Sequence, residues 1–96
     1  MVYCICFDIV SDKIRREVTK LIKKLGLVRV QKSVFIGKSD GVNIKKLETE
    51  LNTLLHPRSD KLFIVPLDNL AYQQLQFFGI SLDKRLISRQ VNALFF

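Results

Sequence analysis

Three apolar, β-rich runs alternate along this chain with two segments whose apolar residues recur at helical spacing. The runs cover residues 2–9, 27–36 and 61–67. Between the first two runs, Ser11 is suited to cap a helix that Gly26 then ends, and a second helix stops before Pro57. On a chain of 96 residues, this order favours one α+β domain with both helices on one sheet face. The simplest arrangement is a ferredoxin-like βαββαβ sandwich.

The strand pattern leaves some assignments open. Residues 27–36 form one long strand or two short antiparallel ones, because a polar patch at residues 31–33 is suited to a tight bend. The runs at 2–9 and 61–67 carry apolar residues on both parities, which is typical of inner strands. Pro66 nevertheless places the end of the later run near an edge or a bulge.

The end of the chain is the least regular part of the pattern. Residues 75–78, closed by Gly79, are a candidate extra C-terminal strand. Residues 81–96 are too apolar to be left in water. We therefore divide the chain into a domain of residues 1–80 and a C-terminal extension of residues 81–96, which packs on the body or on a partner.

The sheet face opposite the helices also needs cover. A chain of this size buries only about 60–65% of its unfolded surface, so a monomer is expected to be marginally stable. A second copy of the same chain would cover the free face. The sequence therefore favours a homodimer.

Positive charge is concentrated in the first two fifths of the chain. The whole chain carries a formal charge of +7, and residues 1–38 hold nine basic and three acidic side chains. The first predicted helix shows a basic stripe opposite its apolar face, made of Lys13, Arg16, Lys20, Lys23 and Lys24, with Arg15 at its border. A clustered excess of this kind indicates a polyanionic partner, with nucleic acid ahead of a membrane surface. The alternative is a solvated face that only aids solubility.

Several common chemistries have no support in the sequence. It contains no glycine-rich phosphate loop, no zinc-like Cys/His spacing and no nucleophile elbow. Cys4 and Cys6 alternate within one strand, where small buried hydrophobes are expected rather than reactive thiols. The apolar N-terminus meets Asp8 too early for a membrane span. We expect a protein of the cytoplasm with no membrane partner.

Asp8 is the acid with the clearest chemical implication. It ends a predicted inner strand beside a helix N-terminus, where a buried carboxylate is costly without a partner. It either caps the turn or pairs with a nearby arginine, or it ligates a hard cation beside a phosphate site. One carboxylate holds magnesium weakly, and a two-fold dimer would bring a second Asp8 to the same ion.

The chain also resembles a known family over about residues 1–80. The residues that carry the resemblance are Phe7-Asp8-Ile9, Ser11-Asp12 with Arg15-Arg16, Gly26, Arg29-Val30-Gln31-Lys32-Ser33-Val34-Phe35, and Asp60 followed by Leu62-Phe63-Ile64-Val65-Pro66-Leu67. They resemble the Cas-two family of CRISPR-associated proteins. Phe7 stands where the family usually has tyrosine, which leaves one hydroxyl fewer beside the site, and the tail from Ser81 matches nothing in the family pattern.

The resemblance implies a ferredoxin-like homodimer with two family roles. One is a magnesium-dependent endonuclease acting on single-stranded RNA or duplex DNA, and the other is a non-catalytic, DNA-binding centre of the spacer-integration complex, held by a CRISPR integrase. Asp8 matches the family's catalytic, metal-binding aspartate, so that one magnesium or manganese ion would be shared between two copies. Nucleic acid would be bound by Arg15, Arg16, Lys20, Lys23, Lys24 and Arg29. Asp12, Ser33 and Phe35 would support the cleft.

Two other classes remain open from the sequence. One is a toxin-like ribonuclease of the related virulence-associated D family, which shares the small fold and the single aspartate. The other is a plain RNA-binding ferredoxin-like module, which lacks support because aromatics interleaved with glycine on a central strand are absent.

Overall fold

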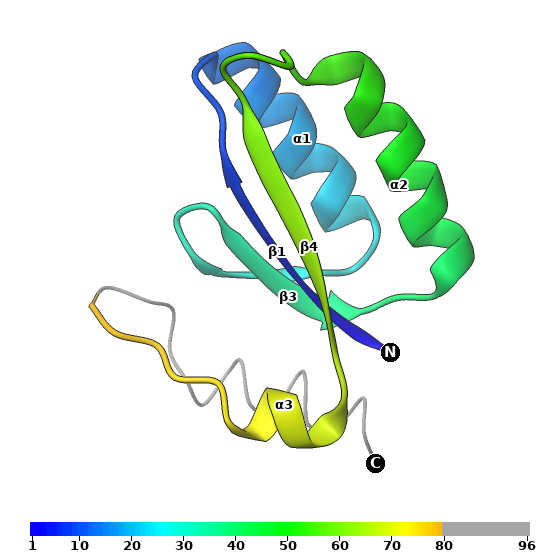
Figure 1. Ribbon diagram of the computed structural model, residues 1–96, viewed down its shortest axis with the longest axis vertical. Coiled ribbons are helices and arrows are strands. Elements are labelled where there is room, and N and C mark those ends of the chain that lie inside the picture. The colour runs from blue at the N-terminus through cyan, green and yellow to red at the C-terminus, as the bar shows by residue number, and fades with distance from the viewer. Residues whose placement is uncertain (80–96) are drawn as a thin grey trace.

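The structure, a computed structural model, describes residues 1–79 of the 96-residue chain. They form a four-stranded sheet and three helices (Figure 1). The elements in chain order are β1 (Val2–Asp8), α1 (Asp12–Lys24), β2 (Val28–Gln31), β3 (Val34–Lys38), α2 (Gly41–Leu54), β4 (Lys61–Leu67) and α3 (Asn69–Gln73). The proposed extension, residues 81–96, lies outside the described residues.

The sheet has the strand order β2-β3-β1-β4, and each neighbouring pair is antiparallel. This order confirms the ferredoxin-like arrangement expected from the sequence. Residues 27–36 form two strands, since a turn at Lys32 and Ser33 reverses the chain between β2 and β3. The prediction that β4 is an inner strand was wrong. β4 pairs with β1 alone within the described residues, and an edge position leaves room for Pro66, which has no backbone N–H to donate.

The core lies between the sheet and the two long helices. Ser11 caps α1 as expected, because its hydroxyl accepts a hydrogen bond from the backbone N–H of Ile14 at 3.3 Å. Ile5 and Phe7 of β1 pack under the helices, while α1 and α2 contribute apolar residues at helical spacing. Buried residues of this core are Ile5, Phe7, Ile9, Val18, Ile22, Leu27, Phe35, Leu47 and Leu51.

The opposite face of the sheet, which we call the outer face, has a smaller apolar cluster. Val2, Ile36 and Leu67 are buried there, with Val30 of β2. α3 and the segment after it cover one end of this face, where Ala71, Tyr72, Leu75 and Phe77 pack on the cluster. Elsewhere no other part of residues 1–79 covers the face, and Phe63 of β4 is 59% exposed.

The segment after β4 differs from the prediction. α3 begins directly after Asp68, whose carboxylate accepts a hydrogen bond from the N–H of Ala71 at 2.7 Å. Residues 75–78, predicted as a short strand, are not in a strand. The physical reason is that no backbone hydrogen bond within residues 1–79 pairs this segment with a strand; the Gln31 side chain of β2 donates instead to the carbonyl of Phe78 at 2.8 Å.

Cys4 and Cys6 lie on the outer face rather than in the core. Both are half-buried, and their sulfur atoms are 3.9 Å apart. Burial, together with the neighbouring Cys6, raises the pKa of Cys4 to about 12. A thiol with that pKa stays protonated at neutral pH and is a poor nucleophile, as the sequence predicted. None of the described helices is long and apolar enough to cross a membrane.

Candidate functional site

Asp8 is the last residue of β1, at the end of the sheet where α1 begins. Its side chain is exposed. Because Phe7 is buried under the helices and strand residues alternate between faces, Asp8 lies on the outer-face side. Within residues 1–79, no hydrogen bond or ion pair engages the Asp8 carboxylate. Of the options left by the sequence, the structure therefore supports neither a turn cap nor an arginine partner.

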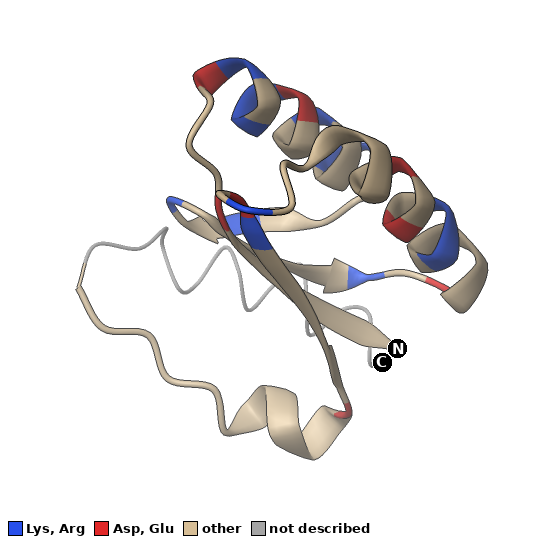
Figure 2. Ribbon diagram, turned by 45° about the horizontal axis from the view of Figure 1, so that its top comes forward, with Lys and Arg blue, Asp and Glu red and all other residues tan. Residues whose placement is uncertain are grey.

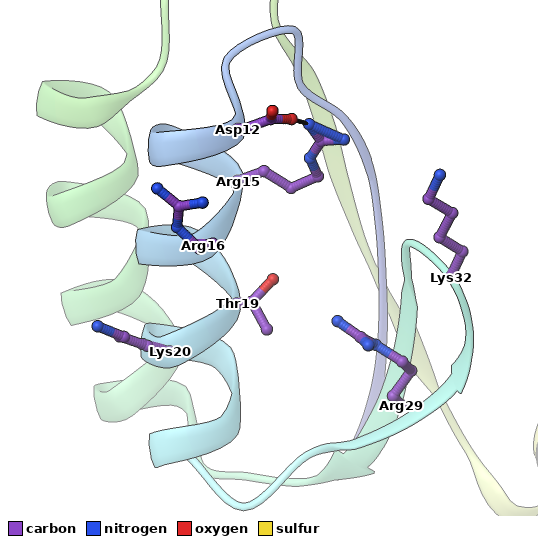
Figure 3. A pocket seen from close by; sticks show the side chains of 7 residues that line it. All are labelled: Asp12, Arg15, Arg16, Thr19, Lys20, Arg29 and Lys32. Carbon is purple, nitrogen blue, oxygen red and sulfur yellow. Dashed lines mark hydrogen bonds and ion pairs between the residues drawn. The ribbon is translucent and has the colours of Figure 1, made fainter.

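A basic pocket opens between α1 and the β2–β3 hairpin, on the flank of the sandwich (Figure 3). Its volume is about 450 Å³. The residues that line it are Asp12, Arg15, Arg16, Thr19, Lys20, Arg29 and Lys32. Each α1 member lies three or four residues from another member, so they share one flank of the helix.

The charges in this pocket are unequal. Asp12 is the acid in the lining, and its carboxylate forms an ion pair with the Arg15 guanidinium. Arg16, Lys20, Arg29 and Lys32 have no ion-pair partner within the described residues. Four positive charges and the Thr19 hydroxyl therefore remain for an anionic ligand. A pocket of this composition suits phosphate groups.

Phe35 and Ser33 support the basic pocket and the end of β1 from inside the fold. The Arg29 guanidinium lies 5.3 Å from the centre of the Phe35 ring, which fixes the arginine by a cation–π contact. The Phe35 ring stacks in turn on Phe7 at 6.0 Å between centroids. The carbonyl of Ser33 accepts a hydrogen bond from the backbone N–H of Phe7 at 3.1 Å. These contacts connect Arg29 to the residue next to Asp8.

Residues of the basic stripe predicted on α1 line different depressions of the surface. Lys20 lines the basic pocket, whereas Lys24 lines a separate depression shared with α2, beside Lys46 and Glu50. Lys23 and Lys24 occupy the last turn of α1, where positive charge stabilises the helix dipole. Their assignment to nucleic-acid binding stays a prediction.

Sequence reasoning missed Lys32 and Thr19 as pocket residues. Lys32 appeared only within a polar patch that favours a bend and within the family motif, and it was not named as a binding residue. Thr19 lies between the charged positions of α1 and carries no charge signal of its own. Helical spacing from Arg15 and Arg16 was the signal that could have found Thr19, since i+3 and i+4 positions are neighbours on a helix.

The loop after Asp8 is fastened to the loop before β4 by Asp60. Its Oδ1 accepts a hydrogen bond from the backbone N–H of Val10 at 3.1 Å, and its Oδ2 accepts one from the N–H of His56 at 2.9 Å. The hydrogen bonds from His56 and Val10 hold the pKa of Asp60 below its usual range. Asp60 is therefore a carboxylate at neutral pH.

The possible metal ligands of one chain are few. Within residues 1–79, no three His, Cys, Asp or Glu side chains gather as a metal-binding group. Asp8 nevertheless fits one kind of ion. Magnesium keeps several water ligands and is commonly bound through one or two carboxylates together with substrate phosphates. A free carboxylate four residues before Asp12, where the basic pocket begins, meets that description.

The comparison with known proteins decides the family. The family model for CRISPR associated protein Cas2 matches residues 1–75. The chain belongs to the Cas2 family. A relative named CRISPR-associated endoribonuclease Cas2 3, from Chloroflexus aurantiacus, is 37% identical over 78 residues, covering 81% of this chain and 83% of the relative. A Cas2 endoribonuclease of Archaeoglobus fulgidus is 33% identical and covers 70% of this chain and 71% of its own.

Solved structures agree with this Cas2 assignment. The structure of Streptococcus pyogenes Cas2 at pH 6.5 has a TM-score of 0.72 at 21% identity, covering 82% of this chain and all of that one, and it supports the fold. A hypothetical protein, TT1823, of Thermus thermophilus has a TM-score of 0.70 at 30% identity, covering 83% and 92% of the two chains. The Cas2 match favours the resemblance drawn from the sequence over the virulence-associated D and RNA-binding alternatives.

Proposed function

We propose that this Cas2-family chain is a metal-dependent endonuclease that binds nucleic acid through the basic pocket. The observation that carries the proposal is a free Asp8 carboxylate at the end of β1, beside the β2–β3 turn whose Lys32 lines a pocket with three further unpaired cations. The hydrogen bond from Phe7 to Ser33 joins the two parts, since Phe7 precedes Asp8 and Lys32 precedes Ser33. The relatives named as endoribonucleases make RNA the first substrate to test, with duplex DNA as the second.

Each part of the site has a distinct task. Arg16, Lys20, Arg29 and Lys32 would hold phosphates of the bound strand, and Thr19 adds a neutral hydrogen-bond donor. Asp8 would hold magnesium, or manganese in its place. A bound ion of this type supplies an activated water and charge stabilisation for phosphodiester hydrolysis.

A homodimer completes the proposed site. Figure 2 shows most of the charged residues, basic and acidic, on α1 and α2, whereas α3 carries none. Phe63 and Val65 of β4 are exposed on the outer face, and Asp8 lies on its margin. A second copy packed on the outer face would cover these side chains and bring its own Asp8 near the first. Both carboxylates would then share one ion.

The test is a cleavage assay with size-excluded protein on single-stranded RNA and duplex DNA. We expect cutting of at least one substrate with magnesium or manganese, and none after chelation. Cutting that continues in excess chelator would contradict the metal's role. Absence of cutting with every substrate and metal would contradict the nuclease.

A second candidate function rests on the basic pocket alone. The pocket's cations come from α1 and the β2–β3 hairpin and do not include Asp8, so duplex binding can persist without cleavage. In that case the chain would be a DNA scaffold within the CRISPR spacer-integration complex, with an integrase as its protein partner. Salt-sensitive duplex binding and integrase binding, without cutting by the wild type, would favour this role.

The pocket predicts which lysines contribute most to duplex binding. Replacing Lys20 and Lys32 together by glutamine should flatten the dependence of log affinity on log salt by up to about 1.8, since each duplex phosphate contact adds roughly 0.9. The matched control replaces Lys23 and Lys24 by glutamine, which removes the same charge outside the pocket. The salt dependence of duplex binding should change less in this control variant than in the Lys20 and Lys32 variant. Equal slopes for the two variants would show that total charge, and not the pocket, determines binding.

A further inference from the structure

β1 loses one of its two strand neighbours before it reaches Asp8. Its register with β3 ends at the pair Cys6 and Val34, whereas its register with β4 continues to the pair Asp8 and Lys61. At Asp8 the backbone is therefore held by β4 on one side only. A strand end held on one side frays more readily than one inside a sheet. Something else has to fix the direction in which the Asp8 carboxylate points.

Asp60 is placed to supply that restraint. It lies directly before β4, one residue from the partner of Asp8. Both of its carboxylate oxygens accept backbone hydrogen bonds, one from Val10, two residues after Asp8, and one from His56, near the start of the loop that Asp60 ends. The Ser59 hydroxyl lies 3.4 Å from the same carboxylate. One side chain thus joins the chain leaving β1 to the chain entering β4.

We propose that Asp60 is a positioning residue for the Asp8 site, which rests on the nuclease function proposed above. By holding Val10, it fixes the strand end that carries Asp8. It also fixes the start of α1, because Ser11, the cap of that helix, follows Val10 directly. α1 contributes Arg16 and Lys20 to the basic pocket. Asp60 therefore fixes the position of Asp8, the proposed metal ligand, relative to the α1 cations that would bind phosphate. It does so through backbone groups and makes no hydrogen bond to Asp8 itself.

The chemistry of the restraint explains why a carboxylate is needed. Both partners of Asp60 are N–H donors, and an ionised carboxylate accepts at both oxygens. Asparagine keeps one acceptor but turns an NH₂ group toward the second N–H donor. Asp60→Asn should therefore keep one of the two bonds, and Asp60→Ala should keep neither.

The test compares Asp60→Ala with wild type and with Asp68→Ala. Asp68 is a matched control, because its carboxylate also accepts a hydrogen bond from a backbone N–H. The donor is Ala71, and the bond lies at the start of α3. In Asp60→Ala we expect faster exchange of the Val10 amide proton. We also expect Mn²⁺ affinity, measured by electron paramagnetic resonance, to fall up to about tenfold, the lower end of the range for direct partners of a metal ligand, since Asp60 bonds Val10 rather than Asp8 itself. Cleavage at limiting metal should fall with it, while metal-free RNA binding changes less.

Asp60→Asn should lie between wild type and Asp60→Ala in Mn²⁺ affinity, and it carries the test if the alanine variant does not fold. Folded Asp60 variants that match Asp68→Ala in Mn²⁺ affinity and in cleavage would overturn the positioning role while leaving the nuclease intact. If wild type and Asp68→Ala neither bind Mn²⁺ nor cut, the proposed function fails on the wild type alone, and the positioning role fails with it.

Discussion

Asp8→Asn is expected to lose metal-dependent cleavage by about a hundredfold or more while the protein stays folded. The loss follows from removing a charged oxygen ligand, because even the outer partners of metal ligands contribute ten- to a hundredfold. Stability should change by no more than about 0.5 kcal/mol, since Asp8 is exposed and makes no hydrogen bond within the described residues. Cleavage of RNA and duplex DNA in a magnesium titration, with thermal unfolding alongside, measures both effects.

Asp40→Asn is the matched control for the Asp8 variant. It makes the same chemical change at another exposed acid, and asparagine caps a helix about as well as aspartate, so α2 should be unaffected. Its cleavage rate should equal that of wild type. Duplex binding by Asp8→Asn should also be kept, since the basic pocket does not contain Asp8. If Asp8→Asn still cuts after size exclusion, the metal ligand is another group.

The sequence predicted the fold well where local signals and packing agree. The cap at Ser11 and the apolar spacing of α1 placed that helix, and the structure has it at Asp12–Lys24. The strand runs at 2–9 and 61–67 were also placed, with Asp8 at the end of β1. These signals are local, so they can be recognised without knowing which segments meet.

The errors came from features that local patterns do not determine. β4 has apolar residues at odd and even positions because Leu62 and Ile64 pack on the core while Phe63 and Val65 lie on the outer face, and this pattern does not determine which strands flank it. Within residues 1–79 it lies at the sheet edge. α3 was missed since a helix over Asn69–Gln73 is too short to show a periodic apolar face. Its one local signal was Asp68, a good helix cap, three residues before Ala71.

The candidate site was predictable in its parts but not in its arrangement. The sequence predicted Asp8 and the arginines as site residues. Lys32 lines the same pocket as the α1 residues only because the β2–β3 turn places it there. Asp60 was visible only as part of a family motif. Its role depends on hydrogen bonds from the backbone N–H groups of Val10 and His56. Almost every residue type carries such a group, so the sequence does not show which ones Asp60 binds.

Phe35→Ala is the second variant with a large expected effect, and it acts on stability. The ring is 0% exposed, stacks on Phe7 and supports Arg29. Deleting a buried phenylalanine ring costs about 3–5 kcal/mol, a large part of the roughly 5–15 kcal/mol that holds a small domain together. The melting temperature should fall on the order of 20 °C. Thermal and urea unfolding followed by circular dichroism would measure the loss.

Phe35→Leu separates this structural role from a role in the site. Leucine keeps most of the buried apolar volume and gives up the ring contacts with Phe7 and Arg29, which are worth about 1–2 kcal/mol together. We expect the leucine variant to be folded and to cut RNA at low temperature, with activity that follows the folded fraction. A Phe35 variant that unfolds like wild type but has lost cleavage would instead place the ring in the site. Because Phe35 is buried beneath Arg29, it reaches a bound strand only through that arginine, so the structure favours the first result.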